Sequence, residues 1–218
     1  MSNEVIKRIL TSVIIFPILL YCTYKSGFYL ISFLSLFCIL ALYEVCKNTK
    51  YLLSIFFSYI VLFLAFFSFY YLRGETNQSL IILYWVLIST FMSDIGGYVC
   101  GKIFKGKKLT KISPNKTYSG SIGSLFFSLV SLPLLNLAQY FFYNETIVDF
   151  FIFKYFFITL AISIICQAGD LYVSYLKRKI KIKDISRILP GHGGVLDRID
   201  GLIFVLIFIF LLTRLELI

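Results

Sequence analysis

The stretch "PGHGGVLDRIDGLIFVLIFIFLL", residues 190–212, joins a glycine-rich segment to a run of almost pure hydrocarbon side chains. A helix needs about 18–20 apolar residues to cross a bilayer, and this run approaches that length. Asp197, Arg198 and Asp200 stand where such a helix would begin. Because a charged side chain inside a membrane costs about 2.5–3.5 kcal/mol on insertion scales, charges kept there are candidates for function. The stretch therefore predicts a membrane helix with a polar site at its start.

The rest of the chain has the composition of a membrane protein. Of its 218 residues, 59% are hydrophobic, and the mean hydropathy is +0.88. Soluble domains are closer to half apolar. We predict an all-α fold, a polytopic transmembrane helix bundle with about seven spans. The expected spans are residues 9–24, 27–46, 51–72, 79–100, 118–142, 148–176 and 197–214.

The distribution of positive charge indicates how this bundle is oriented. The formal net charge is +10. If the N-terminus is cytoplasmic, nearly all Lys and Arg residues fall on the cytoplasmic side, mostly in the loops 101–117 and 177–196. The exceptions are Lys25, Arg73, Lys154 and Arg214. Since cytoplasmic loops carry an excess of Lys and Arg, we predict a cytoplasmic N-terminus and an odd number of spans.

The basic loops allow more than one interpretation. They could simply set the topology, bind anionic lipid head groups, or bind a polyphosphate. No nucleic-acid-binding motif accompanies the charge, so we expect no nucleic acid partner. The cysteines are scattered through apolar segments without a CxxC pair, which indicates neither a zinc site nor a disulfide framework. The candidates for chemistry are the ionisable residues within the spans, and they fall in three regions.

The first region is "SDIGGYVCGKIFKGKK", residues 93–108. Asp94 lies near the end of the fourth expected span. Gly97 and Gly101 follow it as a GxxxG pair, which lets another helix backbone come close. One interpretation is a packing groove in which Asp94 is hydrogen-bonded to a neighbour. The other is a carboxylate that takes part in substrate binding.

The second region is "KISPNKTYSGSIGS", residues 111–124. Ser113 and Pro114 predict the end of a loop and the start of a helix. The free amide groups of a helix N-terminus, together with Lys116 and the hydroxyls of Ser113 and Thr117, can hold a phosphate. A capped helix with small packing residues is an equally good interpretation.

The third region runs from residue 167 to residue 200. Asp170, Ser174, Lys177 and Arg178 are spaced to share one face of a helix, with the two cations at its end. The glycines of the following segment, 190–194, make a helix there unlikely and suit a backbone that closely approaches a ligand. Asp197 and Asp200 then return two carboxylates to the same end of the bundle. The carboxylates at this end would repel one another unless a cation lies between them. That cation could be an arginine, or it could be Mg²⁺, which takes one or two carboxylates plus substrate phosphates.

At this point a resemblance to a known family becomes specific. The stretch "SYLKRKIKIKDISRILPGHGGVLDRID", residues 174–200, resembles the signature of the phosphatidate cytidylyltransferase (CDP-diacylglycerol synthase) family, and the first and second regions resemble two further family stretches. The resemblance covers about residues 90–205. The positions that fit in type and spacing are Ser174, Lys177, Arg178, Lys183, Asp184, His192, Gly193, Gly194, Asp197, Arg198 and Asp200. The chain departs from the family's usual residues at Asn115, Tyr118, Ser119 and Val173.

The resemblance implies an activity and roles for these residues. CTP and phosphatidic acid would give CDP-diacylglycerol and pyrophosphate, with one or two Mg²⁺ ions held by Asp170 and Asp197. Asp170, Asp197, Asp200 and Lys177 would be catalytic. The expected substrate-binding residues are Asp94, Ser113, Lys116, Thr117, Ser174, Arg178, Lys183, His192, Gly193, Gly194 and Arg198. Residues 1–90 would form N-terminal transmembrane helices, and residues 91–218 a catalytic transmembrane region.

The resemblance also implies a setting for the protein. We expect a homodimer in the cytoplasmic membrane of a bacterium, surrounded by membrane lipids, with its active site facing the cytoplasm. A CTP-dependent membrane lipid kinase and a non-catalytic homologue are the alternatives. A transporter is disfavoured, because its ion-binding carboxylates would lie near mid-membrane, whereas these acids gather with lysines at one face.

Overall fold

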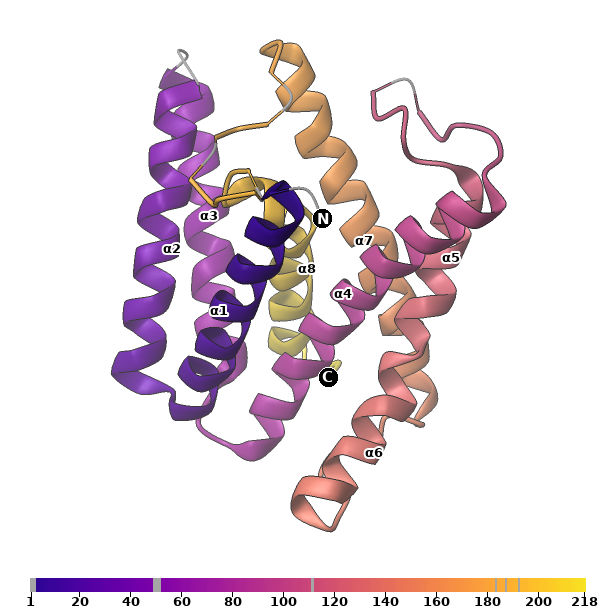
Figure 1. Cartoon of the computed structure of the whole chain (residues 1–218). Coiled ribbons are helices and arrows are strands. Elements are labelled where there is room, and N and C mark those ends of the chain that lie inside the picture. The colour runs from indigo at the N-terminus through magenta and orange to yellow at the C-terminus, as the bar shows by residue number, and fades with distance from the viewer. Residues whose placement is uncertain (1–2, 49–51, 111, 183, 187, 192) are drawn as a thin grey trace.

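The computed structural model describes residues 3–48, 52–110, 112–182, 184–186, 188–191 and 193–218, without the side chains of residues 3–10, 12 and 52–54. Within these ranges the chain forms helices and loops and no named strand (Figure 1). The helices are α1 (Asn3–Lys25), α2 (Gly27–Asn48), α3 (Leu52–Arg73), α4 (Asn77–Phe104), α5 (Tyr118–Leu129), α6 (Ser131–Tyr143), α7 (Phe153–Lys179) and α8 (Leu196–Arg214).

The helices have the length and composition that a membrane requires. Five segments of the described chain are long and apolar enough to cross a bilayer, and α1 contains a shorter apolar stretch, Val13–Lys25. The five segments are Gly27–Asn48, Ile55–Arg73, Asn77–Phe104, Tyr118–Tyr143 and Phe153–Lys179. The predicted all-α, polytopic membrane bundle is therefore confirmed. The number of about seven spans stays a prediction.

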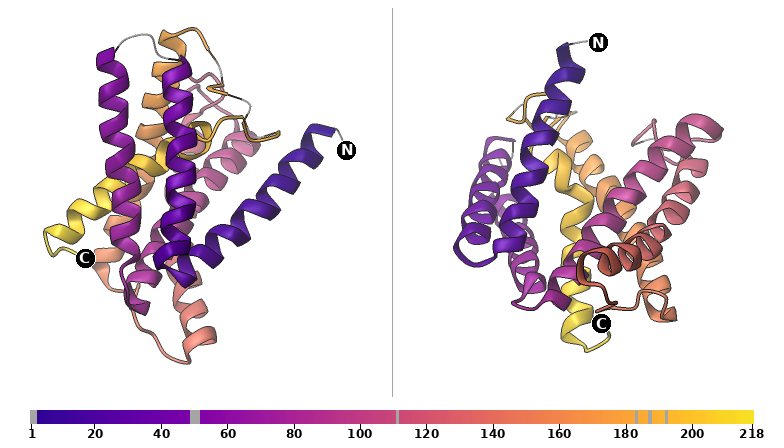
Figure 2. Two further views of the ribbon diagram at one scale, coloured as in Figure 1. Left: turned by 90° about the vertical axis from the view of Figure 1, so that its left-hand side faces the viewer. Right: turned by 60° about the horizontal axis from the view of Figure 1, so that its bottom comes forward.

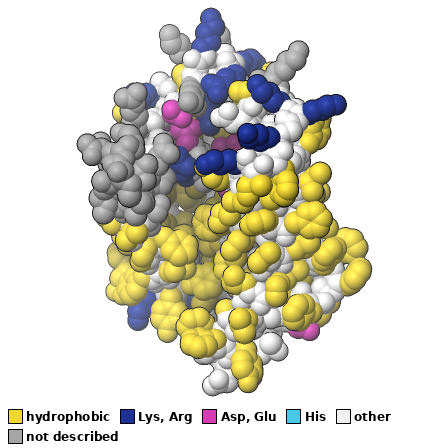
Figure 3. All heavy atoms as spheres, turned by 45° about the vertical axis from the view of Figure 1, so that its right-hand side comes forward, with side chains coloured by type: hydrophobic (Ala, Val, Ile, Leu, Met, Phe, Trp, Pro, Cys, Tyr) yellow, Lys and Arg dark blue, Asp and Glu magenta, His cyan; other side chains and the backbone are white. Residues whose placement is uncertain are grey.

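Charge is concentrated at one end of the bundle. The end of α2 and the described parts of the loops that follow α4 and α7 lie at this end, at the top of Figure 1, and the C-terminus lies in the lower half. In the space-filling view, Lys and Arg side chains gather there with Asp and Glu side chains among them, while hydrophobic side chains cover the lower part (Figure 3). The polar groups discussed below thus share one end of the molecule, which we call the basic end.

The core of the bundle lies around the first half of α4, residues 81–87. Trp85 is fully buried and its indole N–H donates to the Thr159 hydroxyl of α7 at 3.0 Å. Its ring packs against Phe150 and Tyr155. Helix α1, in contrast, diverges from the other helices toward its N-terminus (Figure 2). Helix α4 thus contributes the central side chains of the core, whereas α1 packs less closely.

Glycines let α4 and α5 come into close contact, as the GxxxG pair predicts. A Cβ placed on Gly120 of α5 would lie 2.7 Å from the carbonyl oxygen of Gly97 and 3.4 Å from the Cα of Gly101. A Cβ on Gly123 would strike the side chain of Cys100. Any larger residue here would push the two backbones apart. Asp94 does not join this contact, because it is directed toward α7.

The segment predicted as one span, 118–142, is found as the apolar segment Tyr118–Tyr143, within which α5 and α6 are separated by a turn. The break falls at Val130, whose N–H donates to the carbonyl of Phe127. Pro133 explains it, since proline lacks an N–H and its ring clashes with the carbonyl four residues earlier. Pro17, by contrast, lies within an unbroken α1.

The next helix also begins later than the predicted residue 148. Residues 144–152 lie between α6 and α7, and side chains of α6 hydrogen-bond to the backbone of this loop. Gln139 accepts from the N–H of Val148 at 2.8 Å and donates to its carbonyl at 2.9 Å. Asn136 accepts from the N–H of Phe150 at 3.1 Å. Helix α7 therefore starts at Phe153.

Small residues also bring α7 and α8 together at the basic end. A Cβ on Gly201 of α8 would lie 2.8 Å from the carbonyl oxygen of Cys166, and one on Gly169 of α7 would lie 3.3 Å from the carbonyl oxygen of Asp200. This close crossing places Asp170, the residue after Gly169, beside the first turn of α8. The fold thus joins the two acidic segments of the sequence.

Candidate active site

Asp170 and Asp200 form the centre of the site. Their side chains lie within hydrogen-bonding reach of each other, across the close crossing of α7 and α8. Each carboxylate has a lysine beside it: Lys116 forms an ion pair with Asp170, and the Nζ of Lys177 lies 3.9 Å from Oδ2 of Asp200. Two adjacent carboxylates flanked by two lysines can bind a cation and a phosphate together. We call these four residues the acid–lysine cluster.

Asp197 makes different contacts from Asp170 and Asp200. Its Oδ1 accepts from the Nζ of Lys177 at 2.9 Å. Its Oδ2 accepts from the backbone N–H groups of Ile185 and Gly194, at 2.9 and 3.0 Å. The side chain of Asp197 is 7% exposed, compared with 33% for Asp170. Both oxygens of Asp197 thus hold the protein's own groups, and a cation at this carboxylate would compete with Lys177.

Asp94 borders the cluster from α4. Its Oδ1 accepts a hydrogen bond from the Sγ of Cys166, at 3.6 Å, and its charge interacts with those of Asp170 and Lys116. The expectation of a hydrogen-bonded neighbour is therefore met, and the neighbour is on α7. Asp94 also lines the cavity described below.

The start of α5 differs from the prediction. The helix begins at Tyr118 rather than at Pro114, because the Thr117 hydroxyl acts as the N-cap and accepts from the N–H of Gly120 at 3.1 Å. Residues 113–116 form a turn in which the N–H of Lys116 donates to the carbonyl of Ser113 at 3.1 Å. The turn brings the Lys116 side chain to Asp170. Ser119, one of the departures from the family, donates to the carbonyl of Lys105.

Along α7, the side chains from Asp170 to Lys177 that share one helical face point toward the site. Ser174 donates to Oδ1 of Asp170 at 3.4 Å, as their spacing of four residues predicts. Arg178 lies outside the cluster: its side chain is exposed and donates to the carbonyl of Ile182 at 3.2 Å. Two further predicted positions, Lys183 and His192, lie outside the described residues.

The glycine-rich segment is not helical, as predicted. Gly191 and Gly193 have φ angles of 76° and 93°, which other residues rarely adopt. Gly193 and Leu189 exchange two backbone hydrogen bonds, of 2.9 and 3.1 Å, that close a tight loop. The N–H groups of Gly193 and Gly194 are both used within the protein. Their predicted role toward a nucleotide stays a prediction.

Glu44 of α2 is a functional candidate that the sequence analysis missed. Its side chain is fully buried, and its carboxylate accepts from the backbone N–H groups of Val195 and Leu196 at 2.8 and 2.9 Å. A Cβ on Gly194 would lie 2.8 Å from its Oε1, so this glycine makes room for Glu44. The available signal was one acidic residue inside an apolar span, "ILALYEVC", residues 39–46.

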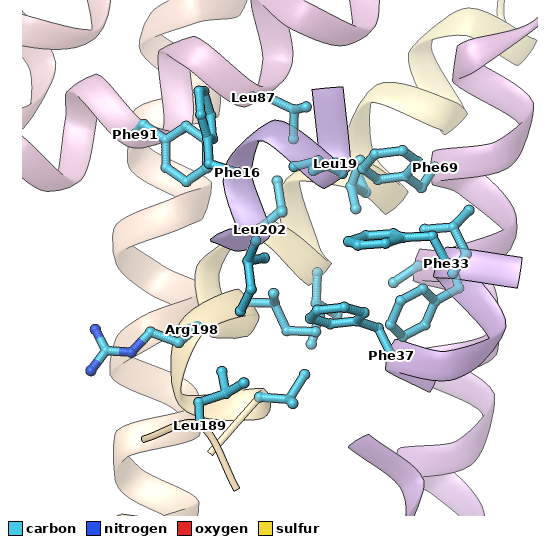
Figure 4. A pocket seen from close by; sticks show the side chains of 18 of the residues that line it. Phe16, Leu19, Phe33, Phe37, Phe69, Leu87, Phe91, Leu189, Arg198 and Leu202 are labelled. Carbon is cyan, nitrogen blue, oxygen red and sulfur yellow. The ribbon is translucent and has the colours of Figure 1, made fainter. Parts of the chain in front are cut away.

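A cavity of about 530 Å³ lies beside the cluster. Figure 4 shows that aromatic and leucine side chains line it, with Arg198 at its edge and the guanidinium pointing away from the ring-lined interior. Asp94 and Thr11 are among its few polar lining residues. The side chains come from α1, α2, α3, α4, α8 and, with Leu189 and Val195, the segment before α8. The cavity offers a hydrocarbon-like space next to charged groups.

The carboxylates of Asp170 and Asp200 fit a magnesium ion that would be bound partly by the protein and partly by a substrate. In the described part of the chain, no three His, Cys, Asp or Glu side chains are grouped closely enough to hold a metal by themselves. Magnesium, however, usually takes only one or two carboxylates and completes its shell with water and substrate phosphates. Asp170 and Asp200 supply two adjacent carboxylates. The predicted pair, Asp170 and Asp197, stays a prediction, and in this structure the Asp197 carboxylate contacts Lys177 and two backbone N–H groups.

The fold and the site define a class of protein: a polytopic membrane protein whose carboxylates and lysines meet at one end of a helix bundle, next to an apolar cavity. Comparison with known sequences gives the family. The family model described as "Cytidylyltransferase family" matches residues 47–215, so this chain belongs to the cytidylyltransferase family.

Relatives from several bacteria are similar to this chain. A phosphatidate cytidylyltransferase of Rickettsia felis is 43% identical over 136 residues, which are 59% of this chain and 56% of that protein. One from Staphylococcus aureus is 42% identical over 144 residues, 66% of this chain and 52% of the relative. One from Helicobacter pylori is 36% identical over 124 residues, 57% and 44% of the two chains. The chain matches about half the length of these curated relatives.

Proposed function

We propose that this protein transfers the CMP unit of CTP to phosphatidic acid and releases pyrophosphate, which yields CDP-diacylglycerol. The observation that carries the proposal is the acid–lysine cluster, Asp170 and Asp200 between Lys116 and Lys177, at the charged end of a membrane bundle. The names of the relatives and the family match support it. One substrate is a lipid and the other a water-soluble triphosphate, so a polar site at a membrane surface suits both.

The cavity supports the lipid as the acceptor. Its apolar lining suits acyl chains, and Asp94 connects it with the cluster. The phosphate of the lipid would then lie near Lys116 and Lys177, whose charges offset its own. We propose the orientation expected from the positive charge, with the N-terminus and the basic end in the cytoplasm of a bacterium, where CTP is present.

The reaction we propose is an in-line displacement at the α-phosphorus of CTP. An oxygen of the lipid phosphate forms the new P–O bond as the bond to the β-phosphate breaks, and pyrophosphate leaves with that electron pair. A phosphate monoester is already largely ionised at pH 7, since its second pKa is about 6, so no strong general base is needed. Lys116 and Lys177 would hold the phosphates in line and stabilise the charge that develops.

We propose that Asp170 holds Mg²⁺ together with an acid of α8. When bound, the ion would neutralise the triphosphate and orient it for attack. Asp200 is the acid that adjoins Asp170, and Asp197 would serve this role only if Lys177 moved away from it. The Nζ of Lys177 lies 2.9 Å from Asp197 and 3.9 Å from Asp200. We propose that this ammonium group leaves Asp197 and binds a phosphate when the substrate is present.

Purified protein with labelled CTP, phosphatidic acid and Mg²⁺ tests the proposal. We expect CDP-diacylglycerol and one pyrophosphate per turnover, and no product without Mg²⁺. Asp170→Asn serves as the inactive control. Release of CDP with a phosphorylated lipid would identify a lipid kinase instead, and no product under any condition would identify a non-catalytic homologue. A homodimer, expected from the family resemblance, would be seen as twice the chain mass of 25.2 kDa in light scattering corrected for detergent.

A further inference from the structure

Glu44 connects the site with α2, a helix that lies almost entirely before the family match. It lies on α2, three residues before residue 47, where the match begins. It nevertheless contacts the loop between α7 and α8 and the start of α8 itself. A fully buried carboxylate is costly unless its oxygens are hydrogen-bonded, so its contacts must be favourable ones.

The partners of Glu44 are the groups that open α8. The N-cap residue of this helix is Val195, whose side chain cannot accept a hydrogen bond. Glu44 takes that role from another helix: Oε1 accepts from the N–H of Val195 and Oε2 from the N–H of Leu196. A negative charge at a helix N-terminus is also favoured by the helix dipole. Glu44 thus caps α8 from α2.

The same carboxylate holds the loop that precedes α8. The Ser186 hydroxyl donates to Oε1 of Glu44 and accepts from the N–H of Ile188 at 3.2 Å. One turn further along α2, the Asn48 amide donates to the carbonyl of Ile185 at 2.9 Å. The end of α2 therefore holds the loop at two places and the helix start at a third.

The first turn of α8 carries Asp197, Arg198 and Asp200, so its position decides where these side chains lie. Three consecutive N–H groups, those of residues 194–196, donate to carboxylates: the first to Asp197 and the other two to Glu44. Without Glu44, two of them would be buried without a partner, and the turn would shift or loosen. Asp200 would then leave its place beside Asp170.

We infer that Glu44 is a positioning residue of the active site, which caps α8 from α2 and thereby holds Asp200 beside Asp170. This inference rests on the proposed function for its catalytic consequence, but the capping itself can be tested without any activity. Removing a partner that orients a metal-binding or catalytic group typically costs 10–100-fold in metal affinity or activity.

The test uses Glu44→Gln in the full chain, reconstituted in lipid nanodiscs. The matched control is Thr23→Val, which removes an equally buried hydroxyl, hydrogen-bonded to Tyr84 at 3.1 Å, far along the sequence from the loop. Hydrogen–deuterium exchange is followed in peptides covering 185–200 and in α4. We expect exchange at 194–197 to rise roughly tenfold or more in Glu44→Gln, as the loss of a hydrogen bond to a charged group predicts, and to stay unchanged in Thr23→Val.

Kinetics of the same variants give the second readout. We expect kcat of Glu44→Gln to fall 10–100-fold and its Mg²⁺ concentration for half-maximal rate to rise, with a melting temperature close to that of Thr23→Val. Ser186→Ala, which removes one of the three hydrogen bonds to Glu44, should give a smaller change in the same direction and keeps the test open if Glu44→Gln does not fold.

Three results would overturn the inference: unchanged exchange at 194–197, faster exchange with unaltered kcat and Mg²⁺ dependence, or equal effects of Glu44→Gln and Thr23→Val. If the wild-type protein forms no CDP-diacylglycerol, the proposed function fails, and the exchange data still decide whether Glu44 caps α8.

Discussion

Two pairs of carboxylates lie at the same end of the bundle and differ in what surrounds them. Glu44 and Asp197 accept hydrogen bonds from four backbone N–H groups in all, so these acids stabilise the loop and the start of α8. Asp170 and Asp200 face each other instead: Lys116 pairs with Asp170, and Asp200 accepts from the N–H of the adjacent Gly201 at 2.9 Å, with the Nζ of Lys177 3.9 Å away. A carboxylate used by the backbone is held in place, whereas one beside a second carboxylate is stabilised further by a cation. The contrast separates acids that build the site from acids that can bind a ligand.

The strongest test of this comparison is to neutralise Asp170 and Asp200, one at a time. We expect Asp170→Asn and Asp200→Asn each to lower kcat by at least about 100-fold, since each removes a carboxylate of the proposed Mg²⁺ site and so weakens binding of the ion that would offset phosphate charge. The melting temperature should stay the same or rise, because mutual repulsion is relieved. Kinetics with saturating CTP and thermal unfolding in detergent measure the two effects. Full activity of both variants would show that Asp170 and Asp200 are not the ligand-binding acids of the site.

Asp197→Asn should have a different balance of effects. We expect kcat to fall 10–100-fold, as for a residue that orients others, and the free energy of unfolding to fall by about 1–3 kcal/mol, because Lys177 and two backbone groups lose their partner. The same two measurements apply. If Asp197→Asn is as inactive as Asp170→Asn and equally stable, Asp197 is a direct ligand, as the sequence predicts.

The smallest expected effect distinguishes two neighbouring cations. Lys177→Met should raise KM for CTP by roughly tenfold, because an ionic hydrogen bond to phosphate is lost. Arg178→Met should change KM less than twofold, since its guanidinium is exposed and donates to the carbonyl of Ile182. An exposed charge of this kind contributes little. Equal effects of the two variants would mean that the substrate binds at the end of α7 rather than at the cluster.

Much of this protein could be predicted from its sequence because membranes restrict what a chain can do. Apolar runs of sufficient length must form helices in lipid, since every backbone group has to be hydrogen-bonded internally. The helical bundle, the loop at residues 190–194, the close contact at Gly97 and Gly101, and the pairing of Ser174 with Asp170 follow from local pattern alone. Pro133 is visible in the sequence too, but whether a proline interrupts the helix within a span depends on its neighbours, and here a turn at Val130 separates α5 from α6 within one span.

The tertiary structure alone decided which acids face one another. Spacing placed Asp197 and Asp200 on the same side of α8, but it could not tell that Oδ2 of Asp197 would be taken by the N–H groups of Ile185 and Gly194. Nor could it connect Glu44 with residues 195 and 196, about 150 positions away. Helical periodicity fixes a residue's direction around its own axis, whereas partners depend on how helices cross, and that crossing is set by packing between distant parts of the chain.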